Sequence, residues 1–425
     1  DSAETSTETM NQSFSLSLNG ECTDEAKAYS ESILNGAAPE LDDGMIPVVI
    51  DNSGSETTVK TISKSDSNWY NYESKKWANV VLTTSSSRSK YLDTTDVVVS
   101  ESDILAYLVW IPRYKYKIWT TTTSSKGSEQ TIEVVFEDKT TPKSTGTTVG
   151  SYRTHPAFTF GDTELNGIWV GKFETTGNAT TPTVKPNLQS LIYQTVSEQF
   201  STAQKFGTST YGSTSKIDAH MMKNSEWGAV AYLSHSKYGV NEEVYINNSS
   251  DYYTGRSGGT TDAISSTNGT YTWDGKTTRG SYASDRTLGT KASTTGNITG
   301  VYDMSGGVGE YLMGYYSGAS TTWGATSDSN YAGFSSKPDS KYYDDYTTDN
   351  SLTACNGGIC YGHALSETAN WYSDYAFFAS SSDPWVICGG GPDYGAGAGV
   401  FSFVGAKGGG SANVNGSFRL VLSAA

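Results

Sequence analysis

Cysteine is the residue type in this chain whose spacing could most readily support chemistry. The chain contains Cys22, Cys355, Cys360 and Cys388, of which only Cys355 and Cys360 lie close together in the sequence. The Asn-Gly-Gly-Ile segment between these two is flexible and could close a local disulfide, but spacing alone does not fix the pairing. It does not fit a zinc site either.

Histidine offers no clearer constellation. The chain has four histidines, His155, His220, His235 and His363, and their spacing matches no metal motif, including the His-Glu-x-x-His pattern. The sequence therefore favours a binding protein over an enzyme, and it indicates no metal centre and no cofactor.

The composition indicates an exported protein made of strands and loops. The 425 residues carry a net charge of −16, and the densest basic run, at 113–117, alternates with tyrosine, which argues against nucleic acid as a partner. The 45 glycines and 29 tyrosines suit strands joined by many loops. No apolar run is long enough to span a membrane. Because the first residue is Asp, we expect a removed leader or anchor, and an extracellular, cell-surface or phage-displayed location.

Turn and periodicity patterns predict three parts of the chain. Residues 1–22 are rich in Ser, Thr and Glu and are expected to be extended or disordered. Residues 23–100 begin with a short helix at 23–36, bounded by an N-cap Thr and a terminal Gly, and continue as a small β element. Residues 101–425 form the larger, ligand-binding domain.

Two helices are predicted in this larger domain. Apolar residues at helical spacing predict an amphipathic helix over 187–206, and a second helix is predicted at 224–239 with Asn224 or Ser225 as its N-cap. Residues 240–295 have little periodicity, which indicates surface loops. Two helices among many short strands and long loops favour an α+β fold.

Four separated segments match one family in order. They are GIWVGKFETTG at 167–177, NSEWGAVAYL at 224–233, NITGVYDMSGGVGEYLMG at 297–314 and GSFRLVLS at 416–423. These segments resemble the formylglycine-generating-enzyme (sulfatase-modifying factor) family. The resemblance implies a C-type-lectin-like domain with two helices, small antiparallel sheets and much irregular loop, preceded here by the small N-terminal helix and β element.

The third segment departs from the family pattern. Gly309 stands where the family has Trp, and this weakens the transfer of function from that loop. Glu310, in the same loop, is expected to accept hydrogen bonds from neighbouring backbone amides. The family's enzymes use a C-terminal cysteine pair that binds copper, whereas no cysteine follows Cys388. A formylglycine-generating-type oxidase is accordingly the least favoured function.

The C-terminal region carries a second resemblance. Its framework of Pro-Trp, paired Gly, Ala-Gly-Val-Phe-x-Phe and Ser-Phe-Arg, from Pro384 to Arg419, resembles that of lectin-fold variable proteins of diversity-generating retroelements. Such proteins occur on bacterial surfaces, pilus tips and phage tails. The resemblance implies that a variable region at about 385–417 is the ligand-binding face, and the predicted strands at 400–403 and 418–422 need burial, which favours a folded face over plain loop. Between and around framework positions lie the predicted ligand-binding residues: Ile387, Cys388, Gly391, Pro392, Asp393, Tyr394, Ala396, Ser402, Val404, Ala406, Ser411, Asn413 and Asn415.

The residue types in this set suit a binding surface. Tyr, Ser, Gly and Asn combine contact area with adaptable hydrogen bonding, as in antibody loops. Trp371, Tyr372 and Trp385 could add aromatic contact area, although burial is the commoner fate of such residues. Charged residues are scarce between 385 and 425, so we expect weak electrostatic steering by this face.

Two functions stay open on the sequence. The favoured one is a surface-displayed ligand-binding protein of adhesin, pilus-tip or phage receptor-binding type, which binds a protein or glycan on another cell or host surface. The alternative is a structural filament or pilin-like subunit decorated by a lectin-like domain, with assembly subunits as partners. Calcium could bind through Asn297, Asp303 and Glu310, whose oxygens could equally make structural hydrogen bonds.

Overall fold

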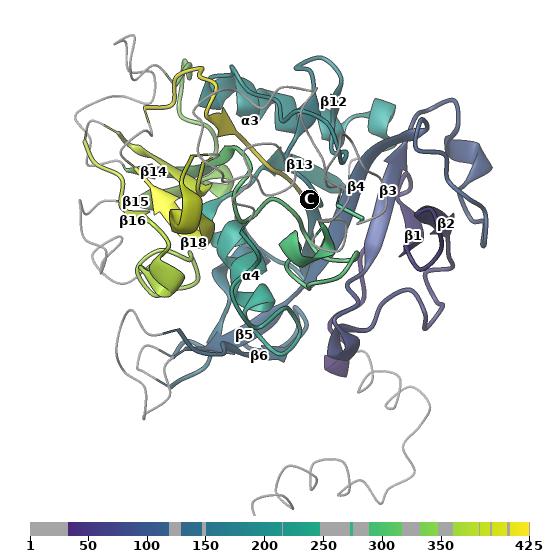
Figure 1. Cartoon of the computed structure of the whole chain (residues 1–425), viewed down its shortest axis with the longest axis horizontal. Helices are drawn as coiled ribbons and strands as arrows, with labels where there is room; N and C mark the ends of the chain where they lie inside the picture. Colours follow the sequence, from purple (N-terminus) through teal and green to yellow (C-terminus); the bar gives the residue numbers. More distant parts are fainter. Residues whose placement is uncertain are drawn as a thin grey trace, which may run out of the picture.

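The fold of the chain is α+β, as the sequence predicts. In the computed structural model the described residues are 33–118, 129–146, 150–214, 216–246, 273–274, 289–316, 332–346, 360–381, 383–391, 393–405 and 409–424. They form two α-helices, several small sheets that are mostly antiparallel, and much irregular loop (Figure 1). The predicted extended N-terminus, nearly all of the predicted helix at 23–36 and most of the loops at 240–295 lie outside the described residues.

The larger sheet is antiparallel throughout and runs across the predicted boundary near residue 100. Its strands, in order, are β13 (Ile217–Met221), β20 (Leu420–Ala424), β10 (Gly167–Gly171), β4 (Ile104–Pro112), β3 (Asn79–Thr83), β1 (Ile46–Asp51) and β2 (Thr58–Thr61). β1 alternates buried and less buried residues, whereas β3, β4 and β10 are covered on both faces. The N-terminal strands therefore complete the sheet of the larger part and share its hydrophobic core.

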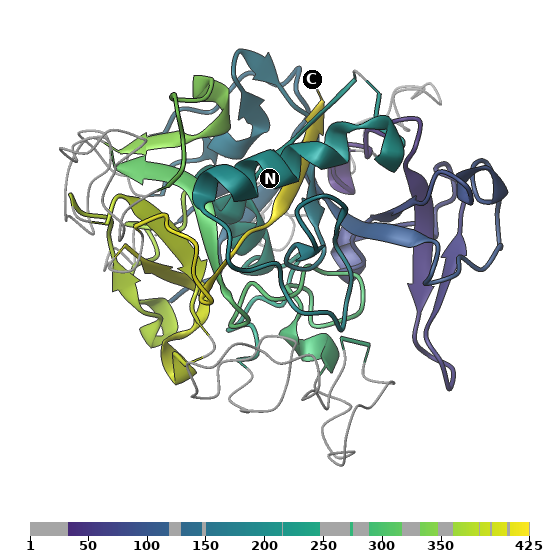
Figure 2. The ribbon, with the colours of Figure 1, turned by 90° about the horizontal axis from the view of Figure 1, so that it is seen from above.

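A second sheet holds most of the predicted variable region. Its strands, in order, are β15 (Asp344–Tyr346), β14 (Gly309–Tyr316), β17 (Trp385–Gly389), β18 (Gly399–Val404) and β16 (Ala376–Phe377), and β19 (Gly416–Ser417) pairs with β14. In Figure 2 this sheet, green to yellow, lies on the opposite side of the molecule from β1 and β2, which are purple. The predicted binding face is thus far from the N-terminal strands.

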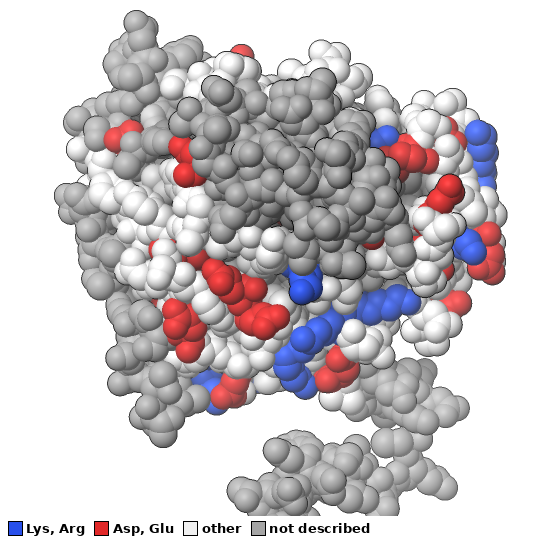
Figure 3. All heavy atoms as spheres, viewed as in Figure 1, with Lys and Arg blue, Asp and Glu red and all other residues white. Residues whose placement is uncertain are grey.

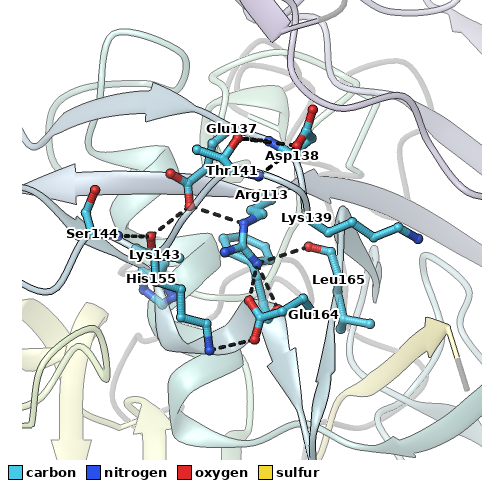
Figure 4. A network of polar contacts seen from close by, with 12 residues as sticks. Arg113, Glu137, Asp138, Lys139, Thr141, Lys143, Ser144, His155, Glu164 and Leu165 are labelled. Atoms are coloured by element: carbon cyan, nitrogen blue, oxygen red, sulfur yellow. Dashed lines mark hydrogen bonds and ion pairs between the residues drawn. The ribbon is translucent and has the colours of Figure 1, made fainter.

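A three-stranded sheet follows β4, and a buried arginine holds the junction. Its strands, in order, are β6 (Glu133–Phe136), β5 (Tyr114–Lys117) and β7 (Arg153–Thr154). Arg113, between β4 and β5, donates through Nε to Glu137 at 3.1 Å and through Nη1 to Glu164 at 2.7 Å, and Lys143 binds the other oxygen of Glu164 (Figure 4). A buried guanidinium is tolerated because it is paired in this way.

Two short hairpins complete the strands, β8 (Thr159–Phe160) with β9 (Thr163–Glu164), and β11 (Thr176–Gly177) with β12 (Pro182–Thr183).

Both helices are shorter than predicted. α3 (Val196–Gln204) begins only where Thr195 and Glu198 form a capping box, so the prediction of helix from residue 187 was wrong. α4 (Asn224–Ser234) is buried along its whole length and ends at Ser234 instead of continuing to residue 239; its N-cap is Lys223 and not Asn224 or Ser225. Neither helix, nor any other in the part of the chain that the structure describes, is long and apolar enough to cross a membrane.

Candidate functional site

The candidate binding face is held from behind by α4 and by the segment before β16. The indole of Trp227, buried in α4, donates through Nε1 to the Val400 carbonyl in β18 at 2.8 Å. The Asp374 carboxylate accepts from the Phe401 amide at 3.0 Å, and a Cβ at position Gly399 would lie 2.1 Å from that carboxylate. Glycine is therefore required there, and β18 is fixed through its backbone rather than through variable side chains.

A buried ion pair anchors β14 to the C-terminal end of the chain. Arg419 and Glu310 have no exposed surface, and Arg419 Nε donates to Glu310 Oε2 at 3.0 Å while Nη2 contacts Glu310 Oε1. Burial raises the pKa of Glu310 to about 7, although Arg419 acts in the opposite direction. The expected role of Glu310 as an acceptor of loop amides falls to Glu174 instead, which accepts from the Val308 amide at 2.9 Å.

In front of these anchors, a cavity of about 90 Å³ opens between β17, β18 and the loops beside them. Its lining consists of Gly309, Ile387, Gly390, Gly391, Asp393, Tyr394, Val404, Asn413 and Asn415. Seven of these nine residues belong to the predicted variable set; the exceptions are Gly309 and Gly390. Gly390 has a φ of +79°, and a Cβ there would lie 2.7 Å from Ala398 Cα, so this part of the wall also requires glycine. Gly309, at the position where the resembled family has Trp, also lines the cavity, and a Cβ there would lie 2.8 Å from Ile387 Cγ2.

Asn413 shapes one part of the cavity wall. Its Nδ2 donates to the Ser411 carbonyl at 2.9 Å and to the Tyr311 hydroxyl at 3.4 Å, and its Oδ1 accepts from the Asn415 amide at 2.8 Å. Its own carbonyl accepts from the Tyr193 amide at 2.9 Å. Both polar atoms of the side chain are engaged within the protein, so Asn413 supports the loop more than it offers hydrogen bonds to a ligand.

Three exposed aromatic residues beside the cavity are absent from the predicted site. The rings of Tyr375 and Tyr394 meet edge to face with centroids 6.0 Å apart. Tyr375 is 49% exposed, and Phe377, 38% exposed, lies opposite Val404 where β16 pairs with β18. Tyr193, next to the loop of Asn413 through its amide, is 62% exposed. The alternation of aromatic residues at 375 and 377 could have indicated an exposed edge strand, whereas nothing local in the sequence marks Tyr193.

Several predicted site residues are buried and do not reach a ligand. Cys388 is 1% exposed and Ser402 has no exposed surface, because β17 and β18 are covered on both faces. The prediction that Cys388 and Ser402 belong to the ligand-binding face is therefore wrong. Of the flanking aromatics, Trp371 and Trp385 are also buried and serve as core packing, while Tyr372 is partly buried.

The remaining predicted residues lie at the edges of the region. Ala396 is exposed, in the short 3-10 turn before β18, and Ser411 is partly buried in the loop that Asn413 holds. Pro392 and Ala406 lie outside the described residues. Ala396 and Ser411 do not line the cavity, and all four positions stay predictions.

The cysteines do not form a reactive centre in the region described. Cys388 is a free, buried thiol, and burial together with Glu310 raises its pKa well above the ordinary value, which keeps it protonated and unreactive. Cys360 is disulfide-bonded. Its predicted partner, Cys355, lies outside the described residues, so that pairing stays a prediction.

The calcium candidates are engaged in other contacts. Asn297 Oδ1 accepts from the Thr299 amide at 2.9 Å, and Glu310 is paired with Arg419. Asp303 acts electrostatically on Glu310. Within the described ranges, no group of three or more His, Cys, Asp or Glu residues is arranged to hold a metal ion. Calcium binding at these residues stays a prediction.

Comparison with known proteins adds no assignment. No protein-family model matches this chain, and no curated protein matches it. The two family resemblances therefore stay predictions, and the cavity with its surroundings is the basis on which a function can be proposed.

Proposed function

We propose that this chain is a surface-displayed ligand-binding protein whose C-terminal face, centred on the 90 Å³ cavity, binds a protein or glycan target. The observation that carries the proposal is that seven residues selected from the sequence meet at this cavity. They are Ile387, Gly391, Asp393, Tyr394, Val404, Asn413 and Asn415. If this segment were plain loop, residues spread from 387 to 415 would have no reason to line one hollow. On this proposal the chain is exported and displayed on a cell or phage surface.

The cavity suits part of a larger partner rather than a whole small molecule. Pockets that enclose small molecules have volumes of about 300–1,000 Å³, several times the value of about 90 Å³ found here. A hollow of this size accommodates one side chain or part of one sugar, while the rest of the partner rests on the surface around it. The exposed Tyr193, Tyr375 and Phe377 supply aromatic area for that contact.

The contacts that hold β18 in the fold are separate from the side chains that could vary. Trp227 and Asp374 hold β18 through backbone atoms of Val400 and Phe401. Substitutions at partly exposed positions of the cavity leave these contacts in place. A rigid scaffold under changeable side chains is what a diversified binding face requires.

The test is a binding screen of the purified chain against a panel of bacterial surface proteins and glycans. The variant is Asp393→Ala/Tyr394→Ala/Asn415→Ala, which removes three side chains from the cavity and cuts no hydrogen bond that holds β18. For any target that binds the parent, we expect the variant to bind at least about tenfold more weakly, since central interface residues commonly contribute more than 1 kcal/mol each.

The control variant is Glu56→Ala/Asn68→Ala/Tyr70→Ala, which also removes one carboxylate, one amide and one tyrosine side chain, near β1–β3 on the other side of the molecule. It should bind as the parent does. Thermal unfolding of all three proteins checks that they are folded. Equal binding by the parent and the cavity variant would refute the proposed face.

A further inference from the structure

One part of the cavity wall places a carboxylate beside an aromatic ring. Gly391, Asp393 and Tyr394 all line the cavity. A Cβ at Gly391 would lie 3.1 Å from Asp393 Oδ1 and 3.3 Å from Tyr394 Cδ1 and Cε1. The carboxylate and the ring therefore lie close to the same point of the wall, where one bound group can contact both.

The Asp393 carboxylate has no partner among the described residues. It makes no hydrogen bond and no ion pair with any of them, and it is the one charged side chain in the described lining. The side-chain amide of Asn415 likewise has no hydrogen-bond partner in the described ranges, although its backbone amide binds Asn413. Since unpaired acceptors in a site are matched by donors of the bound group, the cavity favours a cationic donor.

The rest of the wall is apolar. Ile387 and Val404 lie opposite each other where β17 pairs with β18, and cross-strand partners of this kind point to the same face of a sheet. The Tyr394 ring is in turn packed edge to face on Tyr375, with centroids 6.0 Å apart. The cavity thus combines an aliphatic surface, an aromatic ring and a carboxylate.

We infer that the group that enters this cavity is the side chain of an arginine on a protein partner. The inference rests on the proposed function and adds the chemistry of the bound group. The methylene stem would pack on Ile387 and Val404. The guanidinium would lie against the Tyr394 ring and donate to the Asp393 carboxylate and the Asn415 side chain. Arginine suits this wall better than lysine because its guanidinium is planar, stacks on aromatic rings and is less strongly hydrated than an ammonium.

A glycan fits the same wall less well. Sugar hydroxyls need donors and acceptors on several sides, whereas Asn413 is engaged within the protein through both of its side-chain polar atoms, and much of the lining is glycine or aliphatic. Arginine and tyrosine are instead enriched at the centres of protein interfaces. The wall therefore favours a protein as the partner.

The charge of the surrounding surface matches a basic partner. The sheet of β14–β18 lies on the left in Figures 1 and 3, and there the coloured side chains of Figure 3 are mostly acidic. The whole chain has a net charge of −16. Such a field speeds the association of a basic partner, and it adds to the contact with Asp393 without replacing it.

The test begins with a selection from a displayed library of random disulfide-closed peptides on the full chain, with depletion on the cavity variant Asp393→Ala/Tyr394→Ala/Asn415→Ala. We expect peptides that need the cavity to be enriched in arginine at one position. The leading peptide would then be synthesised with arginine or citrulline there. Citrulline keeps the shape and loses the charge, so it should bind about tenfold more weakly in fluorescence anisotropy. This difference should shrink between about 50 and 500 mM salt.

Single substitutions assign the contacts. Asp393→Asn keeps side-chain size and should abolish the preference for arginine over citrulline. Tyr394→Leu should weaken the arginine peptide about threefold, whereas Tyr394→Phe, which keeps the ring, should not. Asp162→Asn is the matched control, since it removes one exposed carboxylate in the turn between β8 and β9. It should bind as the parent does, and the Tm of each variant checks that it is folded.

Three results would overturn the arginine assignment. They are a selection without arginine-rich, cavity-dependent peptides, equal affinities of the arginine and citrulline peptides, and a preference for arginine that survives in Asp393→Asn or is lost in Asp162→Asn. The proposed function is judged separately, by the panel of surface proteins and glycans. A panel target that binds the parent and not the cavity variant leaves that function standing even if the arginine assignment fails.

Discussion

At the scale of single residues, the binding region depends on buried charges that are far apart in the sequence. Glu310 and Arg419 form an ion pair with no exposed surface, and the charge of Glu310 acts on Glu174 nearby. Burial, then Glu310 and Asp303, raises the pKa of Glu174 well above its ordinary value. Two neighbouring carboxyl groups are therefore buried behind the face, and Arg419 is paired with Glu310, so both cannot be ionised without cost.

This arrangement predicts a pH dependence of stability. A carboxyl group whose pKa is higher in the folded than in the unfolded state binds more protons when folded between those two values, so stability falls as pH rises through that window. For Glu310 the window runs from about 4.3 to about 7, and Glu174 adds to the loss from about 4.3 upward. We expect the Tm to fall between pH 5 and pH 7.5 by a few degrees, about what one or two kcal/mol produces.

The variant Glu174→Gln isolates this effect. Glutamine keeps an acceptor for the Val308 amide and cannot ionise, so the decline in Tm with rising pH should become smaller. Glu56→Gln, an exposed carboxylate near β1, serves as the control and should leave the decline unchanged. Equal pH dependence in the Glu174 variant and the parent would contradict this account of the buried carboxyl pair.

Which residues meet in this cluster could be predicted only in part. The sequence marks Glu310 as a loop residue with structural hydrogen bonds, and it marks Arg419 as framework. It does not reveal that they pair, because 109 positions separate them and no local pattern encodes that contact. For the same reason, the sequence assigned Cys388 and Ser402 to the binding face, although both side chains are buried.

At the scale of elements, α4 and β18 form the support of the face. α4 is buried on all sides, and Trp227 joins it to β18 by one hydrogen bond. Trp371, in the segment before β16, is equally buried and packs edge to face on Phe401, but its indole N–H has no hydrogen-bond partner among the described residues. The two indoles thus differ in hydrogen bonding while both fill core volume.

This difference predicts the outcome of two matched substitutions. Trp227→Phe and Trp371→Phe both shrink a buried indole, but only the first leaves the Val400 carbonyl without its donor. An unsatisfied buried acceptor costs about 1–3 kcal/mol, so Trp227→Phe should lower the free energy of unfolding more than Trp371→Phe by about that amount. Denaturant titration of both variants measures it. A cost for Trp371→Phe equal to or above that for Trp227→Phe would contradict the assigned role of this hydrogen bond.

The sequence predicted the presence of the two helices better than the residues at which they begin and end. The α+β class and the two helices followed from periodicity and turn residues, and the structure confirms that class. The beginning of α3 was misplaced because apolar spacing continues upstream of Thr195, while the capping box there fixes the first turn. The end of α4 was misplaced because Gly239 closes a turn that follows the helix, with its amide bonded to the Ser236 carbonyl.

At the scale of the whole molecule, the face combines one continuous segment with residues that only the fold brings to it. The cavity residues from 387 to 415 could be selected from sequence because they lie in one framework. Tyr193 could not, since it comes from a segment roughly 200 positions away along the chain. Its approach depends on the fold, which brings the Tyr193 amide to the Asn413 carbonyl.

The central claim is that the cavity face is where the target binds, and hydrogen exchange on the complex tests it most directly. The chain would be measured alone and saturated with a target from the panel, and protection compared across all backbone amides. The account predicts slowed exchange at 385–404 and 409–417 and in the segment around Tyr375, with β1–β3 unchanged. Protection confined to β1–β3, or to any face that excludes the cavity, would contradict it.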